Sequence, residues 1–324
     1  MCTAVTYYSK CGYFGRNLDF EYSFGEKVVI VSRNFPFLFR SWGEIPSHYA
    51  VIGMGIVSNN FPLYFDAVNE EGLSMAGLLF SEYAHFHEET SYYENIASFE
   101  LIPWVLSQCK NVSEAKELLQ KTNVTNLDFS REYPSTPLHW IVSDKTSSIT
   151  VESMKDGLFV YDNEVGVLTN SPPFPMQMFS LNNYMSLSPY PPKNLFSDKL
   201  HLNTYSRGMG SIGLPGDLSS TSRFVRGVFA RLNSFSPEDE QCCVNQVFHI
   251  LGGVYQTRGL NMTGENSPEI TRYSSCINMD EGIYYYTTYN NMSLNAVKLS
   301  DHDISGERIY TFPLVTKWNV SFHR

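Results

Sequence analysis

The first two residues of the chain carry its strongest chemical signal. Met1 is followed by Cys2, so removal of the initiator methionine would leave a cysteine with a free α-amine. Such a residue has a thiol and an amine on one Cα, with ordinary pKa values of about 8.5 and about 8. The neutral amine can accept the thiol proton, directly or through one water, so no histidine is needed. The dipeptide alone favours a cysteine that has no catalytic role.

Arg16 and Asp19 are the next candidates, because local structure should bring them to Cys2. Residues 3–9 are rich in β-forming side chains and residues 10–12 give a turn signal, so a β-hairpin is predicted. A cation beside a thiol favours the thiolate, and a carboxylate beside an α-amine orients it. The hairpin geometry alone would also fit an ordinary surface ion pair between Arg16 and Asp19.

The residues around this hairpin resemble the choloylglycine hydrolase family. Met-Cys-Thr-Ala-Val at 1–5 and Phe-Gly-Arg-Asn-Leu-Asp-Phe at 14–20 carry the first part of the resemblance. The family comprises bile salt hydrolases and penicillin V acylases, within the N-terminal-nucleophile hydrolases. Further blocks resemble the family in order along the chain, at 60–67, 69–78, 137–140, 168–174 and 213–224.

The resemblance implies roles for three more residues. Asn170 matches a family asparagine whose side-chain N–H helps form the oxyanion hole, although a turn-forming role before Pro172 is the simpler interpretation from sequence alone. Arg223 matches a second active-site arginine, in the first turn of a predicted helix, where the helix dipole opposes a cation by a few tenths of a kcal/mol. Leu79 stands where bile salt hydrolases usually carry Asn and penicillin V acylases Tyr. The donor there is the backbone N–H, so we expect the chemistry to survive and the substrate contact to change.

The resemblance therefore implies that Cys2 cleaves the amide bond of a glycine- or taurine-conjugated bile acid. Penicillin V acylase or N-acyl homoserine lactone acylase on the same fold is the nearer alternative, and a non-enzymatic binding protein on a decayed fold is the farther one. Aromatic residues near the hairpin and in other loops could wall an acyl pocket, although ordinary core residues would have the same pattern. These pocket candidates are Phe20, Tyr22, Phe24, Phe61, Phe129 and Tyr133.

Composition predicts a single domain spanning residues 1–324, because no linker or charge run divides the chain. The net charge of −10 disfavours nucleic acid or an anionic membrane as partner. The sequence contains no signal peptide and no run of about 18 apolar residues, so a cytoplasmic protein with six reduced cysteines is expected. Residues 186–216 resemble the family's extended assembly loop, which implies a homotetramer.

Strand-like segments occur as hairpins, while helical patterns occur in pairs, which favours an α+β fold. Helices are expected at 94–109, 113–121, 220–235 and 238–253. The resemblance sharpens this to a four-layer αββα sandwich with two stacked antiparallel sheets, the N-terminal-nucleophile hydrolase fold. Two other motifs carry little weight. The glycines of 208–213 lack the strand and helix that a dinucleotide site needs. The His85-Phe-His87 pair is followed by Glu88 and Glu89, which could suggest a metal site, but two histidines in a polar turn more often face solvent. We expect no metal and no cofactor.

Overall fold

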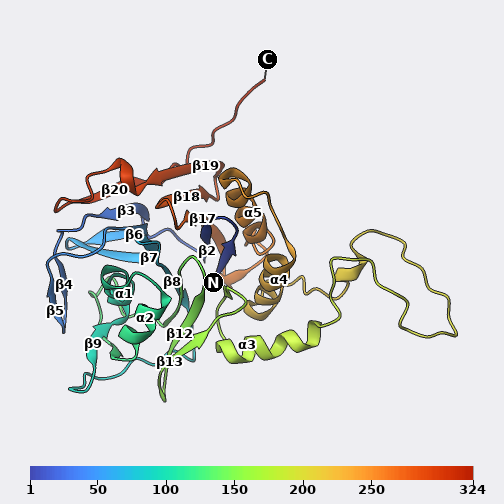
Figure 1. The fold of residues 1–324 in the computed structure, drawn as a ribbon, viewed down its shortest axis with the longest axis horizontal. Helices are drawn as coiled ribbons and strands as arrows, with labels where there is room; N and C mark the ends of the chain where they lie inside the picture. Colours follow the sequence, from blue (N-terminus) through green and yellow to red (C-terminus); the bar gives the residue numbers. More distant parts are fainter. Residues whose placement is uncertain (324) are drawn as a thin grey trace.

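Two large antiparallel sheets form the centre of the computed structural model, which describes residues 1–323 (Figure 1). The first sheet has the order β14-β1-β2-β17-β18-β19. Its strands are β1 (Cys2–Tyr8), β2 (Gly12–Phe20), β14 (Val167–Leu168), β17 (Ile270–Asn278), β18 (Ile283–Thr288) and β19 (Asn291–Lys298). The second sheet has the order β13-β12-β11-β8-β7-β6-β3-β20. Its strands are β3 (Lys27–Val31), β6 (Val51–Ser58), β7 (Phe61–Asn69), β8 (Ser74–Leu79), β11 (Leu138–Ser143), β12 (Ser148–Met154), β13 (Gly157–Asp162) and β20 (Ile309–Pro313).

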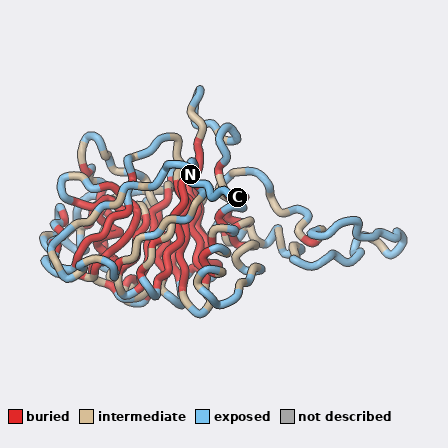
Figure 2. Tube along the Cα trace, turned by 90° about the horizontal axis from the view of Figure 1, so that it is seen from above, coloured by how far each residue is buried: buried red, intermediate tan, exposed pale blue. Residues whose placement is uncertain are grey.

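Helices cover the outer faces of both sheets (Figure 1). The helices are α1 (Leu101–Gln108), α2 (Val112–Leu119), α3 (Phe174–Ser180), α4 (Ser220–Asn233) and α5 (Glu240–Gly252). On one side α4 packs on β1 and α5 on β2 and β17; on the other, α1 packs on β7 and β8 and α2 on β11. Figure 2 shows the buried strands of the two sheets at the centre of the body, as a block of red. This arrangement confirms the αββα sandwich.

Three small two-stranded sheets lie outside these layers. They are β4 (Phe37–Phe39) with β5 (Gly43–Ile45), β9 (Glu94–Ala97) with β10 (Thr122–Thr125), and β15 (Met262–Gly264) with β16 (Ser267–Pro268). The predicted helix over 94–109 is wrong in its first half, because 94–97 form β9 and pair in parallel with β10. The helix begins at Leu101 and has Pro103 in its first turn. Proline is tolerated there, but in the middle of a longer helix it would remove a hydrogen bond and clash with the preceding turn.

The hairpin of β1 and β2 forms as predicted and places Cys2 opposite Leu18. Strand β1 is buried from Cys2 to Tyr7, and it lies between β2 and β14. Gly15 allows α5 to approach β2, since a Cβ at that position would lie 2.5 Å from the side chain of Val247. Close packing from both sides therefore fixes the strand that carries Arg16 and Asp19.

A β-bulge in β7 interrupts the regular strand pairing of the second sheet. Met54 pairs with Asp66 and Gly55 with Tyr64, which leaves Phe65 without a partner on β6. The pairing of β7 with β8 stops at Asp66 opposite Ala76. Bulges bend a strand and end its pairing, and they are frequent beside active sites. Here the bulge opens a gap between the ends of β7 and β8.

Residues 186–216 project away from the sandwich as a long arm (Figures 1 and 2). Several of its apolar side chains are exposed, and they are Tyr190, Leu195, Phe196, Leu200, Leu202, Tyr205 and Ile212. The glycine motif at 208–213 lies at the base of the arm. A Cβ at Gly210 would lie 1.9 Å from the carbonyl oxygen of Tyr190, so packing explains this glycine. Among residues 1–323 no helix is both long and apolar enough to cross a membrane.

Candidate active site

The thiol of Cys2 lies at the start of β1, where the inner faces of the two sheets meet. Cys2 is only 5% exposed, and it lines a cavity whose walls include residues of both sheets. Nη2 of Arg16 is 2.9 Å from Sγ of Cys2, and Nη1 of the same guanidinium donates to the carbonyl oxygen of Phe65 (2.7 Å). Burial opposes the charge on Arg16, but Tyr273, Cys2 and the nearby acidic groups raise the pKa of its guanidinium. The bulge and the hairpin thus hold a cation against the thiol.

The N-terminal end of the chain lies beside Asp19 and Glu269. With Met1 present, the Cys2 nitrogen is an amide that donates to Oδ1 of Asn170 (2.9 Å). The Met1 amine donates to the carbonyl oxygen of Asp19 (2.8 Å) and also contacts the carboxylate of Glu269. Burial lowers the pKa of this amine. An amine created at Cys2 by loss of Met1 would occupy a site already lined with acceptors.

Asp19 faces the same end of β1 from the adjacent strand. Its Oδ1 accepts a hydrogen bond from the Thr271 hydroxyl (2.6 Å), while Oδ2 has no hydrogen-bond partner among residues 1–323. Burial raises the pKa of this carboxyl, and the charges of Arg223 and of the N-terminus act against that rise. Asp19 therefore has one free acceptor buried near the N-terminal amine.

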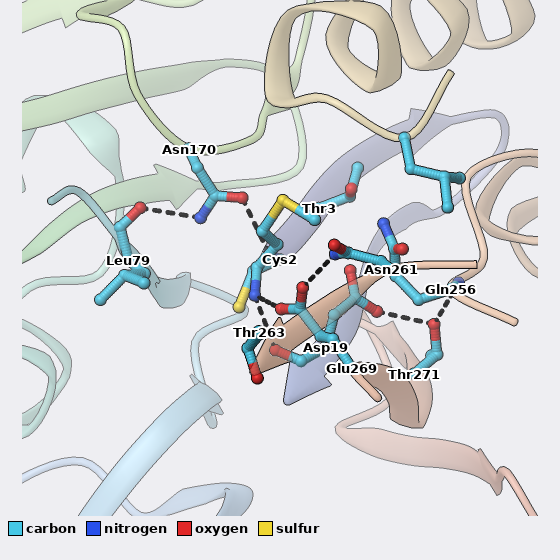
Figure 3. Close-up of polar contacts among 12 residues, drawn as sticks. Cys2, Thr3, Asp19, Leu79, Asn170, Gln256, Asn261, Thr263, Glu269 and Thr271 are labelled. Atoms are coloured by element: carbon cyan, nitrogen blue, oxygen red, sulfur yellow. Dashed lines mark hydrogen bonds and ion pairs between the residues drawn. The ribbon is translucent and has the colours of Figure 1, made fainter. Parts of the chain in front are cut away.

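Asn170 and Arg223 meet on the other side of Cys2. Nη2 of Arg223 donates to Oδ1 of Asn170 (2.7 Å), and Nη1 donates to the Cys2 carbonyl oxygen and to the Thr3 hydroxyl. Burial lowers the pKa of Arg223. Nδ2 of Asn170 donates to the carbonyl oxygen of Leu79 (2.7 Å), as Figure 3 shows. An amide NH₂ has two donors, so one N–H of Asn170 is left for another acceptor.

The backbone N–H and C=O groups of Leu79 point toward the side on which Asn170 lies. Phe80 donates its N–H to Pro137 across the β8–β11 ladder (2.8 Å), and Leu79 lies opposite Leu138. Neighbouring pairs in an antiparallel ladder alternate, so the N–H and C=O of Leu79 point away from β11. They face the gap that the β7 bulge opens. The carbonyl is used by Asn170, and the N–H is directed to the cavity beside Cys2.

A cavity of about 280 Å³ opens in front of the thiol. Its walls are mainly apolar, and they include five of the predicted pocket residues, namely Phe20, Tyr22, Phe24, Phe129 and Tyr133, together with Leu79. Phe20, Tyr22 and Phe24 form a cluster with ring centroids 4.8 to 5.1 Å apart. Phe61 does not line the cavity, because it packs behind the wall on Phe129 (6.2 Å between centroids).

Sequence reasoning missed the residues that support Asn170. No helix was expected directly after Asn170, but the segment leads into α3, with Pro173 as its N-cap. Gln177 of α3 contacts the Asn170 carbonyl oxygen and accepts a hydrogen bond from Thr169. Behind them, His139 bonds to Glu152 and to the Thr169 carbonyl oxygen, at 3.0 Å each. A buried strand histidine gave no sign of this role in the sequence.

Glu269 and Asn261 were also missed, because their segment has no regular pattern. Glu269 is 3% exposed and its second oxygen accepts from Asn261. The two histidines of the His85-Phe-His87 motif lie elsewhere, and His87 bonds to the Met154 carbonyl oxygen. Among residues 1–323 no group of three potential metal ligands is found.

Two antiparallel sheets between helical layers, with a cysteine that a single cleavage would make N-terminal, define an N-terminal-nucleophile hydrolase. Residues 2–312 match the model of the linear amide C–N hydrolases, choloylglycine hydrolase family. A bile salt hydrolase/transferase of Lactiplantibacillus plantarum is 50% identical over 97% of both chains, and one of Clostridium perfringens is 37% identical over 96% of both. The chain belongs to the choloylglycine hydrolase family.

Solved structures agree with this assignment. The mutant C2A conjugated bile acid hydrolase from Clostridium perfringens superposes with a TM-score of 0.93 at 35% identity, over the full length of both chains. Penicillin V acylase from Agrobacterium tumefaciens, at 19% identity, shares the fold with a TM-score of 0.74 over 96% of this chain and 91% of its own.

Proposed function

We propose that this enzyme hydrolyses the amide bond of glycine- or taurine-conjugated bile acids. The observation that carries the proposal is the Cys2 thiol, paired with the Arg16 guanidinium at 2.9 Å, on the wall of an apolar cavity. Sequence relatives named as bile salt hydrolases, which align over nearly the whole chain, support the substrate class.

The reaction would begin after loss of Met1. The Cys2 thiolate attacks the amide carbonyl carbon, and the negative charge moves to the carbonyl oxygen. The Leu79 N–H and the second N–H of Asn170 are placed to stabilise that oxyanion, which is typically worth about 3 kcal/mol per donor. The Cys2 amine carries the thiol proton to the leaving nitrogen, so glycine or taurine departs as a neutral amine. Water then attacks the thioester, releases the bile acid and restores the thiol.

Arg16, Asp19 and Arg223 would prepare these steps without exchanging protons. Arg16 favours the thiolate, and the unpaired oxygen of Asp19 can accept from the Cys2 amine. Arg223 holds Asn170 and the Cys2 carbonyl in place. Both arginines are completely buried and carry positive charge to the site of an acidic protein. An anionic substrate therefore meets local cations despite the net charge.

The cavity favours a bulky apolar acyl group. Ligand sites of this kind have apolar walls with a few polar groups that fix orientation. Here Ser98, Glu132 and Thr136 supply polar groups among the aromatic walls. At about 280 Å³ the cavity is at the small end of such sites, so part of a steroid would extend through its mouth.

Parallel assays test this proposal against penicillin V acylase activity. Amine release from glycocholate and taurocholate should greatly exceed cleavage of penicillin V by the same preparation. A preparation that cleaves penicillin V and leaves both bile salts intact would overturn the substrate assignment. Loss of every activity, with correct folding and Met1 removed, would favour a binding protein.

We infer a homotetramer assembled through residues 186–216, located in the cytoplasm. The exposed apolar side chains of the arm support self-association, since large apolar patches on a surface mark interaction sites. Six free cysteines support a reducing compartment. Light scattering should give four times the mass of one chain, and replacing Tyr190, Phe196 and Tyr205 by Ser should reduce it. An unchanged mass would exclude the arm as the contact.

A further inference from the structure

Asp66 is a completely buried carboxylate that the reaction above leaves without a role. It lies on β7, directly after the bulged residue Phe65, and it reaches across to the first sheet. Three hydroxyls donate to it: Tyr273 to Oδ1 at 2.5 Å, Tyr284 to Oδ2 at 2.5 Å and Ser275 to Oδ2 at 3.2 Å. Both sheets therefore contribute to one buried polar cluster.

The same cluster contains the back of the Arg16 guanidinium. Nη1 of Arg16 lies 3.7 Å from Oδ1 of Asp66, while Nη2 lies 2.9 Å from Sγ of Cys2. Arg16, Asp66 and both tyrosines are fully buried or nearly so. One positive charge thus stands between a carboxylate on one side and the reactive sulfur on the other.

We propose that Asp66 is the permanent counter-ion of Arg16 and acts, through Arg16, as a positioning residue that sets how strongly the Cys2 thiolate is stabilised. This inference rests on the proposed role of Cys2 as nucleophile. It assigns Asp66 no contact with substrate.

The need for a second counter-ion follows from the chemistry at sulfur. The thiolate is negative before attack, but the sulfur is neutral in the thioester. During that stage Arg16 would be buried without an anionic partner, and an unpaired buried charge is strongly unfavourable. Burial raises the pKa of the Asp66 carboxyl, while the Arg16 charge and the three O–H donors act against that rise and favour the ionised form, because an ionised carboxylate can only accept. Asp66 therefore keeps Arg16 in place through the whole cycle.

The second consequence concerns the strength of the nucleophile. The negative charge of Asp66, on the other side of Arg16, weakens the electrostatic stabilisation that Arg16 gives to the Cys2 thiolate. An over-stabilised thiolate is a poorer nucleophile, because thiol reactivity falls with basicity with a Brønsted coefficient of about 0.4–0.5. The other charged groups near the thiol are Arg223, Asp19 and Glu269. Their hydrogen bonds are to Cys2, Thr271 and the Met1 amine and do not involve Asp66, so they remain when Asp66 is changed.

Asp66→Asn tests the proposal, since it removes the charge and keeps the shape. The rate at which iodoacetamide alkylates Cys2, followed by peptide mass spectrometry as a function of pH, reports thiolate formation without any substrate. Loss of a unit charge ~7 Å away, at an effective dielectric constant of about 20, should move the midpoint of this profile down by about 1 to 2 pH units. The value of kcat should fall about fivefold, with KM nearly unchanged.

An unchanged midpoint would overturn the proposal, because it would mean that Asp66 carries no charge next to Arg16. An upward movement would also overturn it, because Asp66 would then merely hold Arg16 against the sulfur. The alkylation profile does not depend on which amide the enzyme cleaves, so failure of the bile salt assignment would leave this test intact.

If Asp66→Asn does not fold, two conservative tyrosine variants test the same proposal. Tyr284→Phe removes one donor and makes proton uptake by Asp66 easier, so the midpoint should move down by less than in Asp66→Asn. Tyr285→Phe is the matched control, since the adjacent Tyr285 hydroxyl bonds to the carboxylate of Glu240 (3.0 Å) on the opposite face of β18. Identical profiles for the two variants would contradict the proposal.

Discussion

Replacing Asn170 by Ala removes a side chain that we assign to the oxyanion hole. The change deletes its bonds to Cys2 (2.9 Å), to Arg223 (2.7 Å) and to the Leu79 carbonyl oxygen (2.7 Å), and it removes the remaining N–H directed at the substrate. The contact between the Cys2 thiol and Arg16 stays as it is, and so do the cavity walls. The variant therefore separates oxyanion stabilisation from formation of the nucleophile.

The expected loss has two parts. Removal of one oxyanion donor typically lowers kcat by about 10²- to 10³-fold, which corresponds to about 2.7–4 kcal/mol in the transition state. The free energy of unfolding should fall by about 1–3 kcal/mol, because Nη2 of Arg223 is left buried without its acceptor. KM should change little, since the carbonyl oxygen gains its full charge only after attack.

Single-turnover acylation with glycocholate at saturating concentration measures this directly, with thermal unfolding as the check on folding. Leu79→Asn is the matched control, because it alters the neighbouring side chain and keeps the backbone N–H. A folded Asn170→Ala variant that retains acylation within about threefold of the wild type would refute the assignment of the oxyanion hole.

Three further outcomes follow from the same geometry. Cys2→Ser should be folded, with kcat lowered at least a hundredfold, roughly 2.7 kcal/mol; turnover that survives alkylation of Cys2 would contradict this. Leu79→Asn should change the ratio of glycocholate, taurocholate and penicillin V turnover by about 1–2 kcal/mol while at least one kcat stays near wild type, because only a side chain on the cavity wall changes. Hydrogen bonds from Ser219 and Ser222 lower the pKa of Asp217 to about 2. Its stabilising effect is therefore complete above the ordinary value of 3.8 and is lost as pH falls toward 2. Urea unfolding of Asp217→Asn should then show less loss of stability over that range than wild type, and equal losses would argue against these bonds.

Local pattern was sufficient for the hairpin that carries Arg16 and Asp19. Its two strands follow each other in the sequence, and residues 10–12 between them have a turn-forming composition. The sequence was therefore enough to predict that Cys2 and Arg16 lie close together. The site roles of Asn170 and Arg223 could not be predicted from local pattern. They lie 168 and 221 residues from Cys2 along the chain, and only the family resemblance pointed to them.

Residues whose roles depend on the stacking of the two sheets could not be predicted. Asp66 sits in an apolar strand pattern, and its partners are hydroxyls on β17 and β18 of the other sheet. The bulge at Phe65 has no sequence signal, yet it decides which face each following residue of β7 presents. The same long-range packing explains Phe61, which was expected in the cavity wall and lies behind Phe129.

Intact mass spectrometry during turnover of glycocholate tests the central claim most directly. We predict that the active protein lacks Met1 and that a bile acyl adduct forms transiently and maps to the N-terminal peptide at Cys2. A fully active preparation that retains Met1, or an acyl adduct on any other residue, would contradict the account, because the Cys2 nitrogen would then be an amide that cannot serve as the base.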